Sequence, residues 1–278
     1  MNIRLTVLFL LLVPGMVRAE VLVLVHGWAS TADTWRISGI ESVLASKGWK
    51  DAGRLPLSTH QAVSKTKLKT KQQKSYYRIH MPAQAPMSAQ ATVLLHAVKL
   101  IQQKHTGEKL HIAAHSAGGL AARLMLLNPA TPKISKFVTI ATPHLGTPRA
   151  IQGLDYADSK PFFCPGPGID FLKTITAGNK YRSVKYSKPA IVDMLPKQYG
   201  GFINWINNQP HPGGQYYSIV KFADGYPGDE MVSATSQNMA NVKAINDKVV
   251  TINTRSSHAL NQNDGYILEA ILSGKYDG

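Results

Sequence analysis

Short apolar runs alternate with longer amphipathic segments along most of this 278-residue chain. Apolar runs of about four to eight residues are typical of buried strands, and apolar residues that recur every three to four positions are typical of helices. The expected strands cover residues 21–25, 75–81, 110–114, 136–141, 216–222 and 248–252. The expected helices cover residues 34–47, 87–105, 118–128 and 260–272. This order predicts an α/β fold, in which a mostly parallel central sheet is flanked by helices.

The segment from about residue 150 to residue 214 interrupts this alternation. It contains a cluster of prolines and glycines at 161–168, followed by apolar and aromatic residues. An excursion of this kind late in a parallel sheet tends to cover the mouth of a pocket. The sequence has no repeat of roughly 20 to 50 residues and no linker that would divide it. We therefore expect one domain over residues 20–278, with a cap-like or lid-like insertion at about 150–214.

The first nineteen residues have the order of a secretory signal peptide. Arg4 precedes an apolar run at 5–13, a Pro-Gly break follows, and the small residue Ala19 ends the segment. We expect cleavage after Ala19 and export of the chain, either to the periplasm or to the outside of the cell. An uncleaved membrane anchor is the alternative, because the apolar run at 21–25 would lengthen the first one.

Positive charge is concentrated in one part of the sequence. The formal net charge is +15, and residues 52–107 contain no acidic residue. Within them, KTKLKTKQQK at 65–74 lacks apolar periodicity, which predicts a loop or a twisted edge strand. This basic region is either a solvated face or a site of peripheral contact with an anionic membrane surface. Nucleic acid is not an expected partner, because no aromatic residues interleave the basic run.

Ser116 lies between an expected strand and an expected helix. The segment IAAHSAGGLAARL places it directly after the strand at 110–114. A nucleophile elbow needs such a turn, because the turn exposes the serine hydroxyl beside the N–H groups of the helix N-terminus. The usual pattern is G-x-S-x-G, and Ala114 replaces the first glycine with the smallest possible side chain. Ser116 is therefore the candidate nucleophile, and a small residue at a helix start is the alternative.

A second strand supplies the candidate oxyanion hole. VLVLVHGW at 21–28 is an apolar strand that runs into a His-Gly turn. A glycine turn at that position exposes a backbone N–H toward the carbonyl oxygen of a bound substrate. The backbone N–H groups of Trp28 and Ala117 are the expected oxyanion donors.

The candidate acid and base follow in the second half of the chain. A glycine-rich loop after the strand at 216–222 carries Asp224, Asp229 and Glu230. His258 comes after the last expected strand, just before the terminal helix. A serine nucleophile followed by an acid and then by a histidine is the order that this kind of site uses, so His258 is the candidate base.

These segments resemble the α/β-hydrolase lipases of bacteria, in particular the secreted triacylglycerol lipase family. The resemblance rests on VLVLVHGW, AAHSAGG, ATPHLGTP, GDEMVSATSQ and SHALNQ, and it leaves residues 150–214 unmatched. The Ala-x-Ser-x-Gly elbow is similar to that of the small Bacillus lipases. ATPHLGTP is similar to a loop that lines the site in Pseudomonas-type lipases. In these families the acid opens an Asp-x-x-Val motif, which implies Asp229 rather than Asp224 as the acid.

The sequence departs from the Pseudomonas-type pattern at the metal site. Those lipases have an aspartate two residues after the catalytic histidine, where it helps to bind calcium, and the residue here is Leu260. Asp264 or Asp247 would have to substitute, so no metal or other cofactor is expected. Cys164 is the only cysteine, which excludes the intramolecular disulfide that some of these lipases carry.

The resemblance implies a serine hydrolase that cleaves carboxylic esters, with lipid esters as the expected substrates. The reaction would pass through an acyl-enzyme on Ser116, with His258 as base and Asp229 as the acid that orients it. A phospholipase, a thioesterase or a polyester depolymerase would use the same residues. A catalytically inactive exported lipid-binding protein is the alternative from a different class.

Overall fold

The computed structural model describes residues 19–56, 74–158, 184, 186–245 and 248–277. Within them, seven strands form one sheet in which every neighbouring pair is parallel, in the order β2-β3-β1-β4-β5-β6-β7. The strands are β1 (Glu20–Val25), β2 (Lys50–Leu55), β3 (Lys74–Ile79), β4 (Lys109–His115), β5 (Lys136–Ile140), β6 (Gln215–Phe222) and β7 (Val249–Arg255). The helices are α1 (Thr34–Ile37), α2 (Ile40–Ser46), α4 (Met87–Lys104), α5 (Ala117–Leu126), α6 (Pro148–Asp158), α9 (Lys188–Val192), α10 (Gly201–Asn207), α11 (Ala234–Gln237) and α12 (Gln262–Leu272), with short 3-10 turns at Lys197–Tyr199 and Met239–Asn241.

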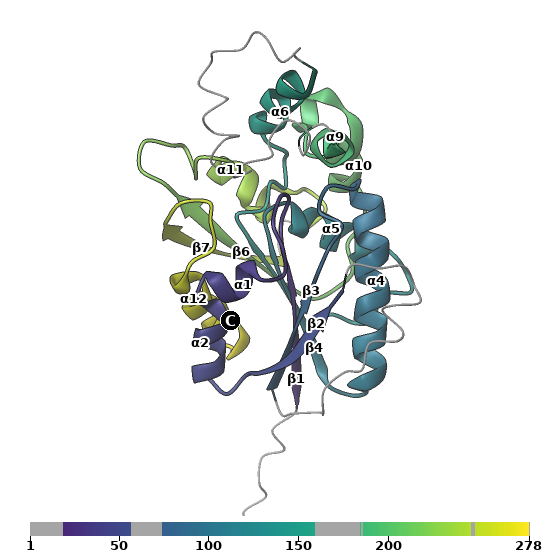
Figure 1. Cartoon of the computed structure of the whole chain (residues 1–278), viewed down its shortest axis with the longest axis vertical. Helices are drawn as coiled ribbons and strands as arrows, with labels where there is room; N and C mark the ends of the chain where they lie inside the picture. Colours follow the sequence, from purple (N-terminus) through teal and green to yellow (C-terminus); the bar gives the residue numbers. More distant parts are fainter. Residues whose placement is uncertain (1–18, 57–73, 159–183, 185, 246–247, 278) are drawn as a thin grey trace, which may run out of the picture.

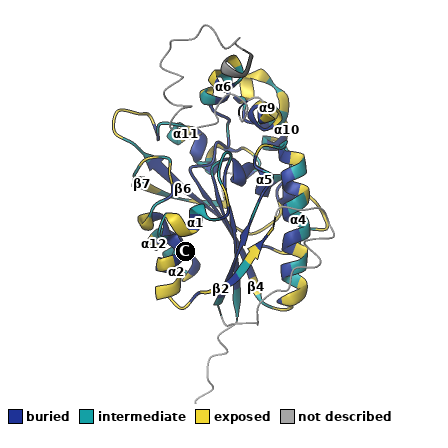
Figure 2. Cartoon of the chain, viewed as in Figure 1, coloured by how far each residue is buried: buried dark blue, intermediate teal, exposed yellow. Residues whose placement is uncertain are grey.

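Helices cover both faces of the sheet, as Figures 1 and 2 show. In β1, Val23 packs in the same apolar cluster as α4 and α5, whereas Leu22 and Leu24 pack with α2 and α12. Successive side chains of a strand point to opposite faces, so a strand that is covered twice must be apolar throughout. This is why the VLVLV run is continuous instead of alternating.

The six expected strands all overlap observed ones, and two expectations about the elements are wrong. The helix predicted over 34–47 is two helices, because Gly39 adopts a positive φ of 83° between α1 and α2. The sequence pattern also missed β2. That strand lies at the sheet edge, carries only Ala52 and Leu55 as buried apolar residues, and has a register shift between Asp51 and Gly53.

Several expectations fall wholly or partly outside the described residues. These are nearly all of the signal peptide at 1–19, most of the basic run at 65–74, Cys164 and the middle of the insertion at 150–214. The expected cleavage point after Ala19 directly precedes β1. In the part of the chain that is described, no helix is long and apolar enough to span a membrane. Export and the cap-like role of the insertion stay predictions.

The described part of the basic region is partly neutralised by acids from outside it. Arg78 in β3 is nearly buried and lies 2.7 Å from Asp51, and Arg54 lies 3.3 Å from Asp33. The lysines of α4 are exposed. Contact with an anionic membrane surface stays a prediction, and among the described residues it would depend on the exposed lysines of α4 more than on these two arginines.

Candidate active site

Ser116 occupies a strained turn between β4 and α5. Its φ of 51° and ψ of −133° lie outside the regions that residues with a side chain normally adopt. The turn is held on both sides, because the Ser116 N–H donates to the Ile140 carbonyl (2.9 Å) and the Gly119 N–H donates to the Ser116 carbonyl (2.9 Å). The predicted strand–turn–helix context of Ser116 is therefore present.

Small residues around Ser116 allow the loop that follows β1, residues 26–33 (the β1 loop), to approach it closely. A Cβ atom at Gly27 would lie 2.9 Å from the Cβ of Ser116, and one at Gly118 would collide with the carbonyl oxygen of His26. Ala114, in contrast, is an ordinary strand residue that pairs with Val25 on one side. A methyl group fits there, which explains why alanine replaces the first glycine of the elbow.

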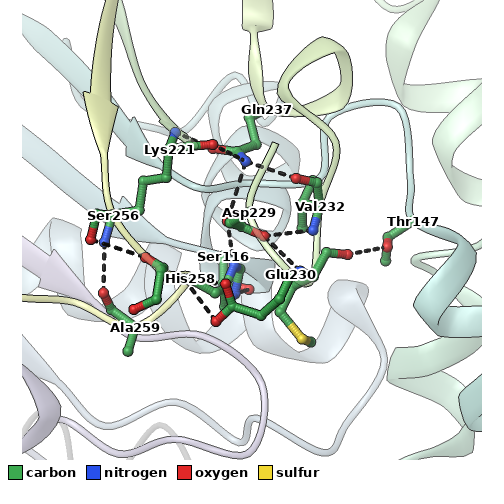
Figure 3. A network of polar contacts seen from close by, with 12 residues as sticks. Ser116, Thr147, Lys221, Asp229, Glu230, Val232, Gln237, Ser256, His258 and Ala259 are labelled. Atoms are coloured by element: carbon green, nitrogen blue, oxygen red, sulfur yellow. Dashed lines mark hydrogen bonds and ion pairs between the residues drawn. The ribbon is translucent and has the colours of Figure 1, made fainter. Parts of the chain in front are cut away.

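Ser116, His258 and Asp229 form one chain of hydrogen bonds. The Ser116 Oγ lies 2.9 Å from His258 Nε2, and His258 Nδ1 lies 2.8 Å from Asp229 Oδ2 (Figure 3). The Asp229 side chain is fully buried and that of His258 is 13% exposed. The structure thus brings together the three residues that the sequence singled out as nucleophile, base and acid. Asp224, the rival acid, is 91% exposed and faces Arg255 instead.

The Asp229 carboxylate is held by backbone N–H groups of its own loop and by the Gln237 amide at the end of α11. Its Oδ1 accepts the backbone N–H groups of Met231 and Val232, both at 2.7 Å, and its Oδ2 accepts the Gln237 amide at 3.2 Å. Oδ2 accepts from N–H groups, so the carboxylate favours the tautomer of His258 with its proton on Nδ1. The Nε2 lone pair is then free to face Ser116.

The two predicted oxyanion donors lie on either side of Ser116 in the fold. Trp28 follows β1 in the loop that Gly27 brings against Ser116, and Ala117 is the first residue of α5. Across the described ranges, neither backbone N–H donates to a protein acceptor. Both donors are thus available to a ligand, and their role in catalysis stays a prediction.

Two buried histidines hold the loops of the site: His26 lies in the loop after β1, and His115 contacts the loop that carries His258. His26 accepts the Met81 N–H at its Nε2 (2.9 Å), and burial lowers the pKa of His26 to about 4. His115 donates from Nε2 to the His258 carbonyl (3.0 Å), and burial lowers the pKa of His115 well below its ordinary value. His115, the residue before Ser116, thus contacts the backbone of the base and also lines the cleft.

The ATPHLGTP segment lines the site and holds the acid loop, which is the segment 223–233 between β6 and α11 that carries Asp229. Pro143 and Thr147 contribute to the cleft wall. The Thr147 hydroxyl donates to the Met231 carbonyl (2.5 Å), and Arg149, the residue after the segment, donates from Nε to the Glu230 carbonyl (3.0 Å). The resemblance of this segment to a site-lining loop agrees with these contacts.

Sequence reasoning missed two charged residues next to the base. The carboxylate of Glu230 accepts the His258 backbone N–H (3.0 and 3.1 Å), and the Lys221 ammonium donates to the Ala259 carbonyl (2.6 Å). A lysine inside the apolar strand YYSIVKF is the signal that was available, because a buried ammonium needs acceptors. From the sequence alone, Glu230 is only one of three acidic residues in the loop after β6.

Asp264, one of the two candidate calcium ligands, pairs with a lysine instead. Asp264 lies 2.7 Å from the Lys221 ammonium, and both side chains are fully buried. Burial raises the pKa of Asp264, and the charge of Lys221 opposes that shift. Asp247 falls outside the described residues, and the described ones contain no group of three or more side chains suited to a metal ion.

Ser116 and His258 line a cleft of about 810 Å³. Its wall combines the β1 loop, α1, α6, α9 and the acid loop. The apolar side chains that line it are Trp28, Ile37, Ala150, Ile191, Met194, Tyr226, Met231, Val232 and Leu260. A largely apolar cleft of this size accommodates a small organic ligand or an acyl chain.

Two family models match the sequence. The family described as "Putative serine esterase (DUF676)" matches residues 18–156, and the family described as "Lecithin:cholesterol acyltransferase" matches residues 92–273. No curated protein matches the chain at a significant level.

Solved structures of bacterial hydrolases share the fold. A Bacillus licheniformis lipase in its mature form is 14% identical, with 93% of each chain covered and a TM-score of 0.62. A metagenomic carboxyl esterase is 14% identical over 92% of this chain and 75% of its own, with a TM-score of 0.53. The phospholipase PlaB of Legionella pneumophila is 14% identical over 80% of this chain and 46% of its own, with a TM-score of 0.53.

These similarities confirm the α/β-hydrolase fold expected from the sequence. Each family model covers half of the chain or more, so the chain belongs to these α/β-hydrolase families of serine esterases and acyltransferases and is a hydrolase of the serine esterase type.

Proposed function

We propose that this enzyme hydrolyses lipid esters through an acyl-enzyme on Ser116. The observation that carries the proposal is the position of His258, which lies within hydrogen-bond distance of Ser116 and Asp229 at the floor of an apolar cleft. Nucleophile, base and orienting acid in contact are the arrangement that activates a serine hydroxyl.

The reaction follows from this geometry. Ser116 Oγ attacks the ester carbonyl while His258 Nε2 takes its proton, and the backbone N–H groups of Trp28 and Ala117 bind the oxyanion. His258 returns the proton to the leaving alcohol. A water molecule, deprotonated by His258, then attacks the acyl carbonyl, and His258 passes that proton to Ser116 Oγ as the acyl–oxygen bond breaks and the carboxylic acid leaves. Asp229 holds the imidazole and stabilises its charged form in both halves of the reaction.

The cleft favours a lipid acyl chain over a small polar acyl group. Apolar side chains dominate its wall, and two large ones remain exposed at its rim: Ile37 is 82% exposed and Tyr226 is 47% exposed. Exposed apolar residues beside an apolar cleft fit a substrate whose chain continues out of the pocket. A phospholipase, a thioesterase or a polyester depolymerase remains an alternative with the same chemistry.

The geometry argues against an inactive lipid-binding protein. Ser116 keeps a strained backbone, and the Asp229 carboxylate is buried with each oxygen bonded. A protein that only binds lipid has no chemical need for this strain or for a buried carboxylate against His258.

The test is turnover of p-nitrophenyl esters by Ser116→Ala. Loss of the nucleophile lowers kcat by about 10⁴ to 10⁶-fold while the fold is retained. Ser46→Ala, on the far helix α2, is the matched control and keeps full activity. A fluorophosphonate probe labels the wild-type chain at Ser116 and leaves Ser116→Ala unlabelled.

Acyl chains of different length test the lipid part separately. The expected result is a kcat/KM that rises from acetyl toward long-chain esters. Near-normal turnover by Ser116→Ala would refute the mechanism, whereas a preference for acetyl esters would refute only the lipid substrate.

A further inference from the structure

The backbone around His258 is held by side chains from three different elements. Its N–H donates to the Glu230 carboxylate, and its carbonyl accepts the Nε2–H of His115 from the end of β4 (3.0 Å). The next carbonyl, that of Ala259, accepts the ammonium of Lys221 from β6 (2.6 Å). The loop between β7 and α12 therefore depends on side chains for the position of the base.

Glu230 contacts the backbone N–H of His258 itself. Both of its carboxylate oxygens lie within hydrogen-bond distance of the His258 N–H, at 3.0 and 3.1 Å (Figure 3). Glu230 is half-buried and lines the cleft. The backbone carbonyl of Glu230 accepts the Nε–H of Arg149, so a residue of α6 fixes the backbone of Glu230.

Adjacent residues of one loop thus hold the same histidine at two points. Asp229 holds the Nδ1 of the His258 ring, and Glu230 holds the N–H of its backbone. With the backbone and one ring nitrogen fixed, the remaining ring nitrogen can point in only one direction, toward Ser116. A catalytic histidine that shifts by about 1 Å can lose a hundredfold in rate.

We infer that Glu230 is a positioning residue for His258, acting through the reach of its side chain and through its charge. This inference rests on the proposed function, because it matters only if His258 is the base. The reach fixes the backbone of the histidine. The negative charge lies beside an imidazole that becomes positive during each half of the reaction, and a nearby anion stabilises that form.

Two conservative variants separate reach from charge. Glu230→Asp keeps the charge but is one methylene shorter, so it loses the contact with the His258 N–H. We expect kcat to fall about tenfold, KM to stay within about twofold, and the acidic limb of the kcat/KM pH profile to stay in place. Glu230→Gln keeps an oxygen acceptor at full length. We expect its kcat to stay within about threefold and the acidic limb to move to lower pH by about half a unit at low ionic strength.

Asp224→Asn is the matched control. It removes a carboxylate from the same loop, and that carboxylate is 91% exposed and paired with Arg255. Its kcat and pH profile should equal those of the wild type, and thermal melts of all three variants establish that they are folded.

Full activity in Glu230→Asp together with an unmoved acidic limb in Glu230→Gln would overturn the inference. If Ser116→Ala is inactive and this result is found, only the role of Glu230 fails. If Ser116→Ala retains activity, the proposed function itself fails.

Discussion

At the scale of single residues, the site depends on how closely two backbone segments approach. Gly118 lets the carbonyl of His26 lie against α5, and Gly27 lets the same loop lie against Ser116. The strain at Ser116 is one consequence of this approach. Ala114 faces no such restriction, because its methyl group lies within the sheet and is fully buried there.

The variants Gly118→Ala and Ala114→Gly test whether the site depends on the close approach of the His26 loop to α5. Glycine to alanine inside a helix ordinarily stabilises a protein by roughly 0.5–1 kcal/mol. At Gly118 we expect the reverse, with the free energy of unfolding lower by about 1–3 kcal/mol and kcat/KM lower by at least a hundredfold, because the His26 loop must move. Ala114→Gly is the control: it should keep activity within about threefold. Urea denaturation and ester turnover provide the measurements, and an active, stable Gly118→Ala would contradict the argument.

At the scale of elements, a buried ion pair joins β6 to α12. Lys221 and Asp264 are both fully buried, and Asp264 also closes the capping box of α12 with Asn261. The Lys221 ammonium also donates to the Ala259 carbonyl, in the loop between β7 and α12 that carries His258. The packing of α12 and the position of that loop are therefore coupled.

Breaking this pair should be costly, whereas removing both charges should not. Lys221→Met leaves a buried, unpaired carboxylate, and we expect the free energy of unfolding to fall by about 3–5 kcal/mol. Adding Asp264→Asn removes that charge while an amide oxygen still caps α12, so most of the loss should return. Arg255→Met, at the exposed pair with Asp224, should change stability by less than about 0.5 kcal/mol. A double variant as unstable as the single one would argue against a penalty from unpaired charge.

The elements also show what a sequence reveals and what it does not. Strands covered on both faces, such as β1, were predictable because burial dictates each of their residues. The edge strand β2 was not, since half of it faces solvent. Ser116, Asp229 and His258 were predictable because each follows a strand in a recognisable order. Glu230 was not, because its role arises only where two loops distant in sequence meet. For Lys221, the strand position signals a buried ammonium that needs acceptors, but it does not identify the Ala259 carbonyl as one of them.

At the scale of the whole molecule, the fold buries several histidines. Six of the described histidines are nearly inaccessible to solvent, and burial lowers the pKa of five of them: His26, His111, His115, His144 and His211. They lie in different parts of the molecule, from the site to the sheet. His111 in β4 is distinctive, because within the described chain neither of its ring nitrogens has a hydrogen-bond partner. Burial lowers the pKa of His111 to about 3.

Such a fold should lose stability in mild acid. Above pH 6.5 these histidines are neutral in both states and contribute nothing to pH dependence. As the pH falls from 6.5 toward 4, the unfolded chain binds protons that the native chain excludes. For His26, His111 and His211, whose pKa burial lowers to about 3 or 4, each contribution destabilises the fold by roughly 2 kcal/mol at pH 5. His111→Leu should remove one such contribution: its free energy of unfolding, measured by urea denaturation, should fall by about 2 kcal/mol less than that of the wild type between pH 7 and pH 5. Its esterase activity at pH 8 should be unchanged, because His111 does not line the cleft. Parallel stability curves for the two proteins over this range would show that His111 is protonated alike in the folded and unfolded chains, contrary to the prediction.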